Sequence, residues 1–326
     1  MKEKISYATA ILEGFQYLLN KHPEVFIIGQ GVWSPWYVGN TMKGLEDDFG
    51  RDRVIDTPTS ESAVTGLALG ASISGRKPIV VHPRMDFMLY AMDQIVNQAA
   101  KWSHMFGGQQ SPDLTIRGII NRGGEQGAQH SQALHAWFAH IPGLRVVMPS
   151  TVSDARNLLI SSVLCSDPVM FFDDRWLYDV EDTIDPIQET DLRLIKPQTL
   201  VSGESITVVS SGYSTKLCLE ASEKLKESNV NIELIDLRVL TDIDYTDILS
   251  SVKKTRKLLC VDGGWASCGI SSEIIASVCE KIEPGTLLKK PKRITLPAAP
   301  APTSIALENI YYTKVDDIVE YCISQK

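Results

Sequence analysis

Apolar and polar positions alternate along the chain between a spacing typical of helices and one typical of buried strands. Residues 5–21 repeat apolar side chains every three or four positions, which predicts an amphipathic helix. The next apolar run, at 25–29, is short and uninterrupted, and it predicts a strand buried on both faces. The alternation continues with predicted strands at 53–56, 78–82, 114–120, 145–149 and 168–173 and predicted helices at 62–74, 91–104, 131–140 and 153–164. This order is typical of a mainly parallel sheet with helices on both faces.

The alternation stops over a polar and acidic stretch and resumes near residue 205. We therefore predict a first domain at 1–175, a linker at 176–204 and a smaller second domain at 205–326. The second domain has predicted strands at 206–211, 232–237, 257–262 and 292–297 and predicted helices at 215–228, 244–254, 269–281 and 315–323. The predicted fold class is α/β, with two domains.

Length and composition agree with this organisation and exclude several classes of protein. The chain has 326 residues, of which 44% are hydrophobic and 22% charged, as in ordinary globular proteins. A membrane-spanning helix needs about 20 consecutive apolar residues, and no stretch of the sequence approaches this length. No secretory signal is visible. The net charge of -8 disfavours nucleic-acid binding through a basic face. Six scattered cysteines without a Cys-x-x-Cys pair disfavour zinc or iron–sulfur sites and suggest a cytoplasmic protein.

The first candidate site follows the predicted strand that ends at Asp56. Pro58 ends this strand, and Ser60 is a candidate N-cap for the next helix. Glu61 then lies in the first helical turn, near the positive end of the helix dipole. The carboxylate of Glu61 either caps the helix or hydrogen-bonds a heterocyclic ligand at the carboxyl edge of the sheet, where open parallel sheets bind ligands.

The second and third candidates are a histidine after a glycine-rich loop and a pair of aromatic residues. The loop at 117–132 has neither the dinucleotide fingerprint nor the P-loop spacing. It places His130 near a predicted helix start, which favours a neutral imidazole that accepts a proton, although a purely structural histidine fits as well. Phe87 and Tyr90 follow another predicted strand, and they either pack in the core or stack on a flat ring.

Four segments in this order resemble one known family, the beta subunits of thiamine-diphosphate-dependent 2-oxo acid dehydrogenases. These segments are 53–61, 92–101, 127–132 and 141–149, and further matches are Asp236-Leu237-Arg238 and Ala301-Pro302. The resemblance covers nearly the whole chain. It implies a transketolase-like pyrimidine-binding domain followed by a transketolase C-terminal domain.

The resemblance also implies roles for the candidate residues. Glu61 would contact a ring nitrogen of the cofactor's aminopyrimidine and so promote loss of the thiazolium proton, while His130 would handle substrate intermediates and acyl transfer. The implied cofactor contacts are Gln30, Thr59, Glu61, Phe87 and Tyr90. The family also binds potassium through backbone carbonyls, which correspond to Leu114, Ser162, Cys165 and Asp167.

The implied reaction is decarboxylation of a 2-oxo acid and transfer of the acyl unit to a lipoyl group. The chain has no Gly-Asp-Gly run followed by a double asparagine, the motif that holds magnesium and the diphosphate in this family. That half of the site belongs to an alpha subunit, so the resemblance implies an alpha-two beta-two assembly and a lipoyl-bearing acyltransferase as partners. Two alternatives remain open: a two-chain carboligase acting on an aldehyde or sugar, and a non-catalytic subunit.

Two positions depart from the family pattern. Gln30 stands where family members usually carry an acidic residue, and an amide keeps hydrogen bonding but loses charge and proton transfer. Arg84 follows the predicted strand end at His82 and either binds an anionic or phosphorylated substrate or lies in solvent. These departures suggest altered substrate or acceptor specificity.

Overall fold

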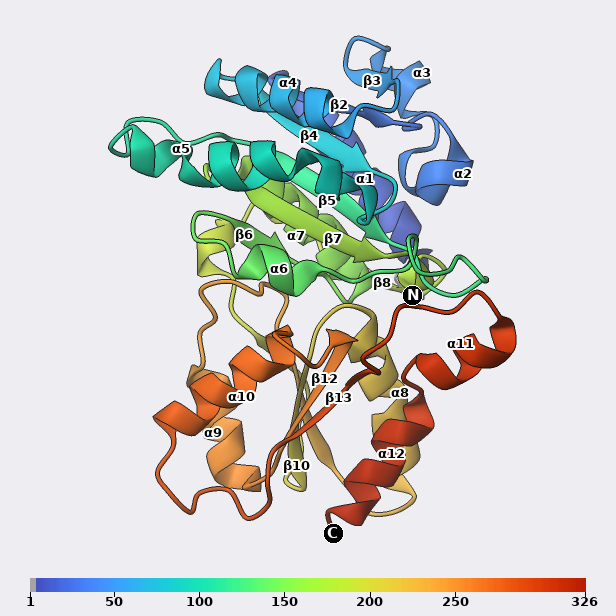
Figure 1. Ribbon diagram of the computed structural model, residues 1–326, viewed down its shortest axis with the longest axis vertical. Coiled ribbons are helices and arrows are strands. Elements are labelled where there is room, and N and C mark those ends of the chain that lie inside the picture. Colours follow the sequence, from blue (N-terminus) through green and yellow to red (C-terminus); the bar gives the residue numbers. More distant parts are fainter. Residues whose placement is uncertain (1–3) are drawn as a thin grey trace. The chain divides into compact units, whose positions relative to one another are not determined.

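The computed structural model describes residues 4–326, which divide into two compact units (Figure 1). Unit 1 contains the chain up to Arg122 together with Phe138–Ile195, and unit 2 contains Gly123–Trp137 and Lys196–Lys326. The domain limits at 175 and 205 stay predictions. No helix among the described residues is both long and apolar enough to cross a membrane.

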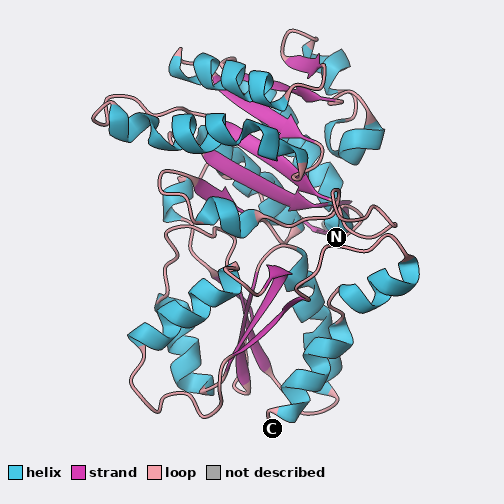
Figure 2. Cartoon of the chain, in the orientation of Figure 1, coloured by secondary structure: helices cyan, strands magenta, loops and turns pink. Residues whose placement is uncertain are grey.

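Unit 1 is built on a six-stranded sheet in which every strand pair is parallel, as the sequence predicts (Figure 2). The strand order is β3-β2-β4-β5-β7-β6. The strands are β2 (Val25–Gln30), β3 (Val54–Thr57), β4 (Lys77–His82), β5 (Thr115–Ile120), β6 (Arg145–Val147) and β7 (Val169–Asp174). The close pairing of β2 with β4 requires Gly29, because a Cβ there would lie 2.3 Å from the carbonyl oxygen of Val81.

Helices cover both faces of this sheet, which confirms the predicted architecture. Helices α4 (Glu61–Ile73) and α5 (Ala100–Met105) lie on one face, and α1 (Tyr7–Lys21) and α7 (Val152–Leu164) lie on the other (Figure 1). Helix α1 packs along α7, and its buried face includes Ile11, Phe15 and Leu18, the positions with helical spacing.

Short elements complete unit 1. They are the strand pair β1 (Lys4–Ser6) and β8 (Glu181–Thr183), the α-helices α2 (Pro35–Val38), α3 (Leu45–Phe49) and α6 (His135–Ala139, which crosses the unit limit), and the 3-10 turns η1 (Gly39–Met42), η2 (Phe87–Ala91), η4 (Arg175–Leu177) and η5 (Leu192–Leu194). The predicted helix at 91–104 is instead three elements, because a π-helix, η3 (Asp93–Ala99), joins η2 to α5. π-helical turns often mark functional segments.

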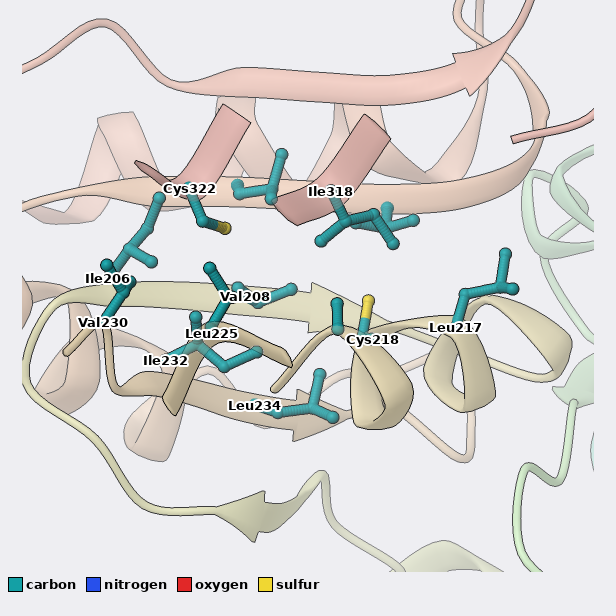
Figure 3. Packing of buried hydrophobic residues seen from close by; sticks show 13 residues of the cluster. Ile206, Val208, Leu217, Cys218, Leu225, Val230, Ile232, Leu234, Ile318 and Cys322 are labelled. Carbon is teal, nitrogen blue, oxygen red and sulfur yellow. The ribbon is translucent and has the colours of Figure 1, made fainter. Parts of the chain in front are cut away.

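Unit 2 is the predicted smaller α/β fold, with a five-stranded sheet in the order β13-β12-β10-β11-β9. Its strands are β9 (Gln198–Val201), β10 (Ile206–Ser210), β11 (Ile232–Asp236), β12 (Leu258–Trp265) and β13 (Lys292–Leu296), and its helices are α8 (Tyr213–Lys226), α9 (Thr246–Thr255), α10 (Ile270–Lys281), α11 (Ile305–Tyr311) and α12 (Val315–Ser324). Strand β9 is the antiparallel member of this sheet. Helices α8 and α12 enclose a core in which the free thiols of Cys218 and Cys322 are buried (Figure 3).

Candidate active site

The carboxyl ends of the central strands of unit 1 gather most of the candidate residues at one edge of the sheet. Gln30 ends β2 and pairs in register with Thr57 at the end of β3, and His82 ends β4. The chain passes from β2 outward to β3 and then crosses back to β4 on the other side of β2. This reversal is a topological switch point, the place where open α/β sheets bind ligands.

Glu61 is the first residue of α4, and its side chain is available to a ligand. The N-cap position is Ser60, as predicted, but the Ser60 hydroxyl makes no capping hydrogen bond. The carboxylate of Glu61 is half-buried and has no hydrogen-bond or ion-pair partner among the residues that the structure describes. Glu61 therefore does not act as a capping group within the chain, and neighbouring Thr59 is exposed.

The turn after β2 is fixed by contacts that hold Gln30 at the same edge. The Asp56 carboxylate accepts hydrogen bonds from the Val32 amide at 3.2 Å and the Thr57 amide at 3.1 Å, which ties this turn to β3. Gly31 has φ of +66°, and a Cβ there would lie 2.6 Å from the Tyr37 ring. Glycine is therefore needed at this turn.

His82 is a buried residue of this edge for which the sequence predicted no role. Its side chain is 4% exposed, and its Nε2 lies 3.4 Å from the hydroxyl of Thr65 on α4, one helical turn beyond Glu61. Burial lowers the pKa of His82 to about 4, so the imidazole is neutral near pH 7. The one signal in the sequence was its position at a strand end.

The two aromatic candidates differ in exposure. Phe87 begins η2 and is half-buried, whereas Tyr90 is 74% exposed and is therefore not a core residue. The following π-helix approaches α4 closely, because a Cβ on Gly66 would lie 3.5 Å from the Gln94 side chain. Turn η2 also packs against α4, so the segment that carries both aromatic residues lies beside the helix that carries Glu61.

His130 lies in unit 2, and its local structure differs from the prediction. Residue 130 is in a turn, and helix α6 begins only at His135 rather than at 131. The reason is tertiary packing, since Nε2 of His135 lies 3.0 Å from Oδ1 of Asp262, and both side chains are buried. The His135–Asp262 contact ties this segment to the end of β12. His130 therefore does not lie at a helix N-terminus, contrary to the prediction.

The Asp262 carboxylate is held in its charged form although it is buried. Burial alone raises its pKa, but His135 and the amides of Gly264 and Ser271 outweigh that effect and lower the pKa below its usual value. The loop before His130 is also anchored within unit 2. The Glu125 amide donates to Oε1 of Glu308 at 2.9 Å.

The four carbonyls proposed for potassium come from the start of β5 and the end of α7. The Leu114 carbonyl accepts a hydrogen bond from Val169 at 2.9 Å, and the Ser162 carbonyl accepts one from Cys165 at 3.3 Å. A carbonyl oxygen has a second lone pair. Burial raises the pKa of the Cys165 thiol, so this side chain stays protonated, and the Asp167 carboxylate binds Arg145 at 2.7 Å.

Comparisons with known proteins place both units in described families. Residues 3–180 match the transketolase pyrimidine-binding domain, and residues 196–318 match the transketolase C-terminal domain. The beta subunit of acetoin:2,6-dichlorophenolindophenol oxidoreductase from Bacillus subtilis is 35% identical over 98% of this chain and 96% of its own length. The mitochondrial pyruvate dehydrogenase E1 component subunit beta of Homo sapiens is 33% identical over 97% of this chain and 89% of its own length.

A solved structure agrees with the fold. It is described as a split gene transketolase in an inactive beta4 tetramer, and it superposes with a TM-score of 0.78 over 98% of this chain and 97% of its own chain. At 17% identity, this likeness shows the fold alone.

Proposed function

We propose that unit 1 of this chain supplies the pyrimidine-binding half of the active site. The reason is that the chain belongs to the family of beta subunits of thiamine-diphosphate-dependent 2-oxo acid dehydrogenases. In this proposal Glu61 is the catalytic carboxylate. The observation that supports this role is the position of the Glu61 carboxylate at the start of α4, at the switch point of the sheet. This carboxylate has no hydrogen-bond or ion-pair partner among the described residues.

The residues at this edge fit the aminopyrimidine half of thiamine diphosphate. The cofactor, when bound, supplies the electron sink for decarboxylation of the 2-oxo acid. Glu61 holds the proton at a pyrimidine ring nitrogen, and the half-buried Phe87 packs against the ring. Gln30 and Tyr90 add further contacts to the cofactor, and the Gln30 amide orients it by hydrogen bonding without taking up a proton. Thr59, directly before the helix, completes the contact set.

The rest of the active site comes from an alpha subunit in this proposal. That subunit holds magnesium and the diphosphate, in an alpha-two beta-two assembly. A lipoyl-bearing acyltransferase accepts the acyl group, with His130 assisting the transfer. Potassium binds the backbone carbonyls of Leu114, Ser162, Cys165 and Asp167, and a cation beside Ser162 and Cys165 also offsets the negative end of α7.

The test uses this chain purified together with its alpha subunit, with magnesium and thiamine diphosphate. Reduction of an artificial electron acceptor is followed with a panel of 2-oxo acids. Removing a catalytic acid–base group costs about 100- to 10,000-fold in rate, so Glu61→Gln should lose turnover on this scale. The control is Glu227→Gln on the exposed surface of unit 2, which should keep full turnover. Unchanged rates in Glu61→Gln would contradict the assignment.

A second candidate function is carboligation, which the uncharged Gln30 favours because a proton-transferring group is absent there. The same complex would then form products with aldehyde or sugar acceptors without lipoyl-dependent turnover. Failure of every 2-oxo acid in a complex that binds the cofactor, with product formation from aldehydes, would select this alternative. Loss of activity in Glu61→Gln excludes a non-catalytic subunit.

A further inference from the structure

We propose that Arg84 and Arg175 form a binding site for a second anionic group, so that the donor is a 2-oxo acid with a carboxylate or phosphate at its far end. This inference rests on the proposed function and names the substrate class of that same site. It follows from the positions, the hydrogen bonds and the charge balance of the arginines at the carboxyl edge of the unit 1 sheet.

The two arginines come from different strands and are linked through an asparagine. Arg84 lies two residues beyond β4, Asn121 directly follows β5, and Arg175 directly follows β7, so all three lie at the carboxyl ends of neighbouring strands. The Asn121 amide donates to the Pro83 carbonyl at 3.1 Å and accepts from Nη1 of Arg175 at 3.1 Å. Nη2 of Arg175 donates to the Trp36 carbonyl at 3.0 Å. These bonds hold the Arg175 guanidinium beside the segment that carries Arg84.

Two other arginines, one within β5 and one beyond its end, each have a carboxylate partner. The pairs are Arg117 with Asp173 at 2.7 Å and Arg122 with Asp174 at 2.9 Å. Among the described residues, neither Arg84 nor Arg175 has a carboxylate oxygen within the 4.0 Å of an ion pair. The acceptors of Arg175 are neutral oxygens. The edge therefore carries two positive charges without a direct ion-pair partner.

The Arg84 guanidinium is not simply a solvent-exposed surface charge. Its Nη1 is buried and has no hydrogen-bond partner among the described residues. Burial lowers the pKa of Arg84, the nearby Arg175 lowers it further, and Asp86 and Tyr37 oppose this effect. A buried donor without an acceptor and two like charges near each other both cost free energy. Such an arrangement is stabilised when an anion binds between the guanidinium groups.

An anionic end of the donor fits this arrangement chemically. The guanidinium group presents a planar fork of donors that matches the two oxygens of a carboxylate or phosphate. A site built to pair a charged group rejects an analogue without it, because the buried donors then stay unpaired. The pair thus selects donors that carry a second anionic group at the far end.

The experiment compares two donors that have similar shapes and differ in charge, together with a phosphorylated donor. The complex with the alpha subunit, loaded with thiamine diphosphate and magnesium, is assayed with 2-oxoglutarate and with 5-methyl-2-oxohexanoate, in which an isopropyl group replaces the second carboxylate. Phosphohydroxypyruvate is a third donor, which distinguishes phosphate from carboxylate. The variants are Arg84→Gln, Arg84→Lys and the exposed control Arg76→Gln, each checked for its unfolding midpoint and for cofactor binding.

We expect wild type to prefer at least one donor with a second anionic group over the monoanionic analogue. Loss of a charge-assisted bond predicts that Arg84→Gln reduces this ratio of kcat/KM by about 10- to 100-fold, that Arg84→Lys restores part of it, and that Arg76→Gln retains it. Turnover of 5-methyl-2-oxohexanoate as good as that of 2-oxoglutarate and of phosphohydroxypyruvate would overturn the inference and leave the proposed function standing.

A binding measurement separates the inference from the proposed function. Glutarate, which has two carboxylates but no 2-oxo group to react, is titrated calorimetrically into the same complex alongside 5-methylhexanoate. If no 2-oxo acid of the panel is turned over, the proposed function fails, and this titration alone decides on the anion site. The anion site is supported if wild type binds glutarate more tightly than 5-methylhexanoate and Arg84→Gln loses this preference. Equal binding of glutarate by wild type and by Arg84→Gln overturns the inference.

Discussion

Replacing Asp173 by asparagine tests what holds the carboxyl half of the unit 1 sheet together. The Arg117 side chain and the Asp173 carboxylate are both 0% exposed, and they form two parallel bonds of 2.8 Å and 2.7 Å between β5 and β7. The Tyr178 hydroxyl also donates to Asp173 at 2.6 Å. Burial alone would lower the pKa of Arg117, but Asp173 raises it above its usual value, so the guanidinium stays charged.

The expected magnitude follows from the burial of this pair. Asparagine leaves the Arg117 charge buried without its counter-ion, which costs about 3–5 kcal/mol of unfolding free energy. In a domain of this size that loss lowers the thermal midpoint by about 6–20 °C. Calorimetry of the assembled enzyme would record the midpoint. The matched control is Asp191→Asn, whose carboxylate pairs with Arg193 on the surface and should change the midpoint little. Equal midpoints for the two variants would refute the reasoning.

Two further predictions concern pH and the loop of unit 2. Because the pKa of His82 is about 4 folded and near 6.5 unfolded, the unfolded chain binds more protons between these values. The free energy of unfolding should therefore fall by up to about 1.4 kcal/mol per pH unit as the pH drops from 6.5 to 4. Urea titrations should show that this free energy depends less on pH in His82→Gln than in wild type. Asp262→Asn should free the segment 123–137 and speed its cleavage in limited proteolysis, compared with Asp48→Asn on the surface; equal cleavage would argue against the anchoring role of the pair.

The parallel sheet of unit 1 could be predicted because its strands are short apolar runs separated by helical spacing. Elements without such a pattern were missed. Strand β9 has four residues and none of them is buried, and it is held by pairing with β11 rather than by its own apolar content. The π-helical turn η3 has the same apolar positions as an α-helix, so spacing alone does not distinguish the two.

The candidate site could be predicted in part for a similar reason. Proline and serine before Glu61 mark a helix start, and the structure begins α4 there. Contacts between distant segments leave no local signal. The bond between Asn121 and Arg175 joins residues 54 positions apart, and the pair of His135 with Asp262 spans 127. Only the tertiary fold brings such residues together.

Two departures from the family pattern make this edge of the sheet more positive. Gln30 removes a negative charge that the family pattern places after the first strand, and Arg84 adds a positive charge beyond β4. Strands β2 and β4 are neighbours, so both changes act on the same end of the sheet. Charges that are partly removed from water interact over longer distances than charges in bulk solvent. The combined effect is a more positive potential at the switch point, which stabilises a donor with a second anionic group and disfavours an uncharged one. Gln30 therefore supports the same substrate class as the arginine pair, by removing repulsion rather than by forming a bond.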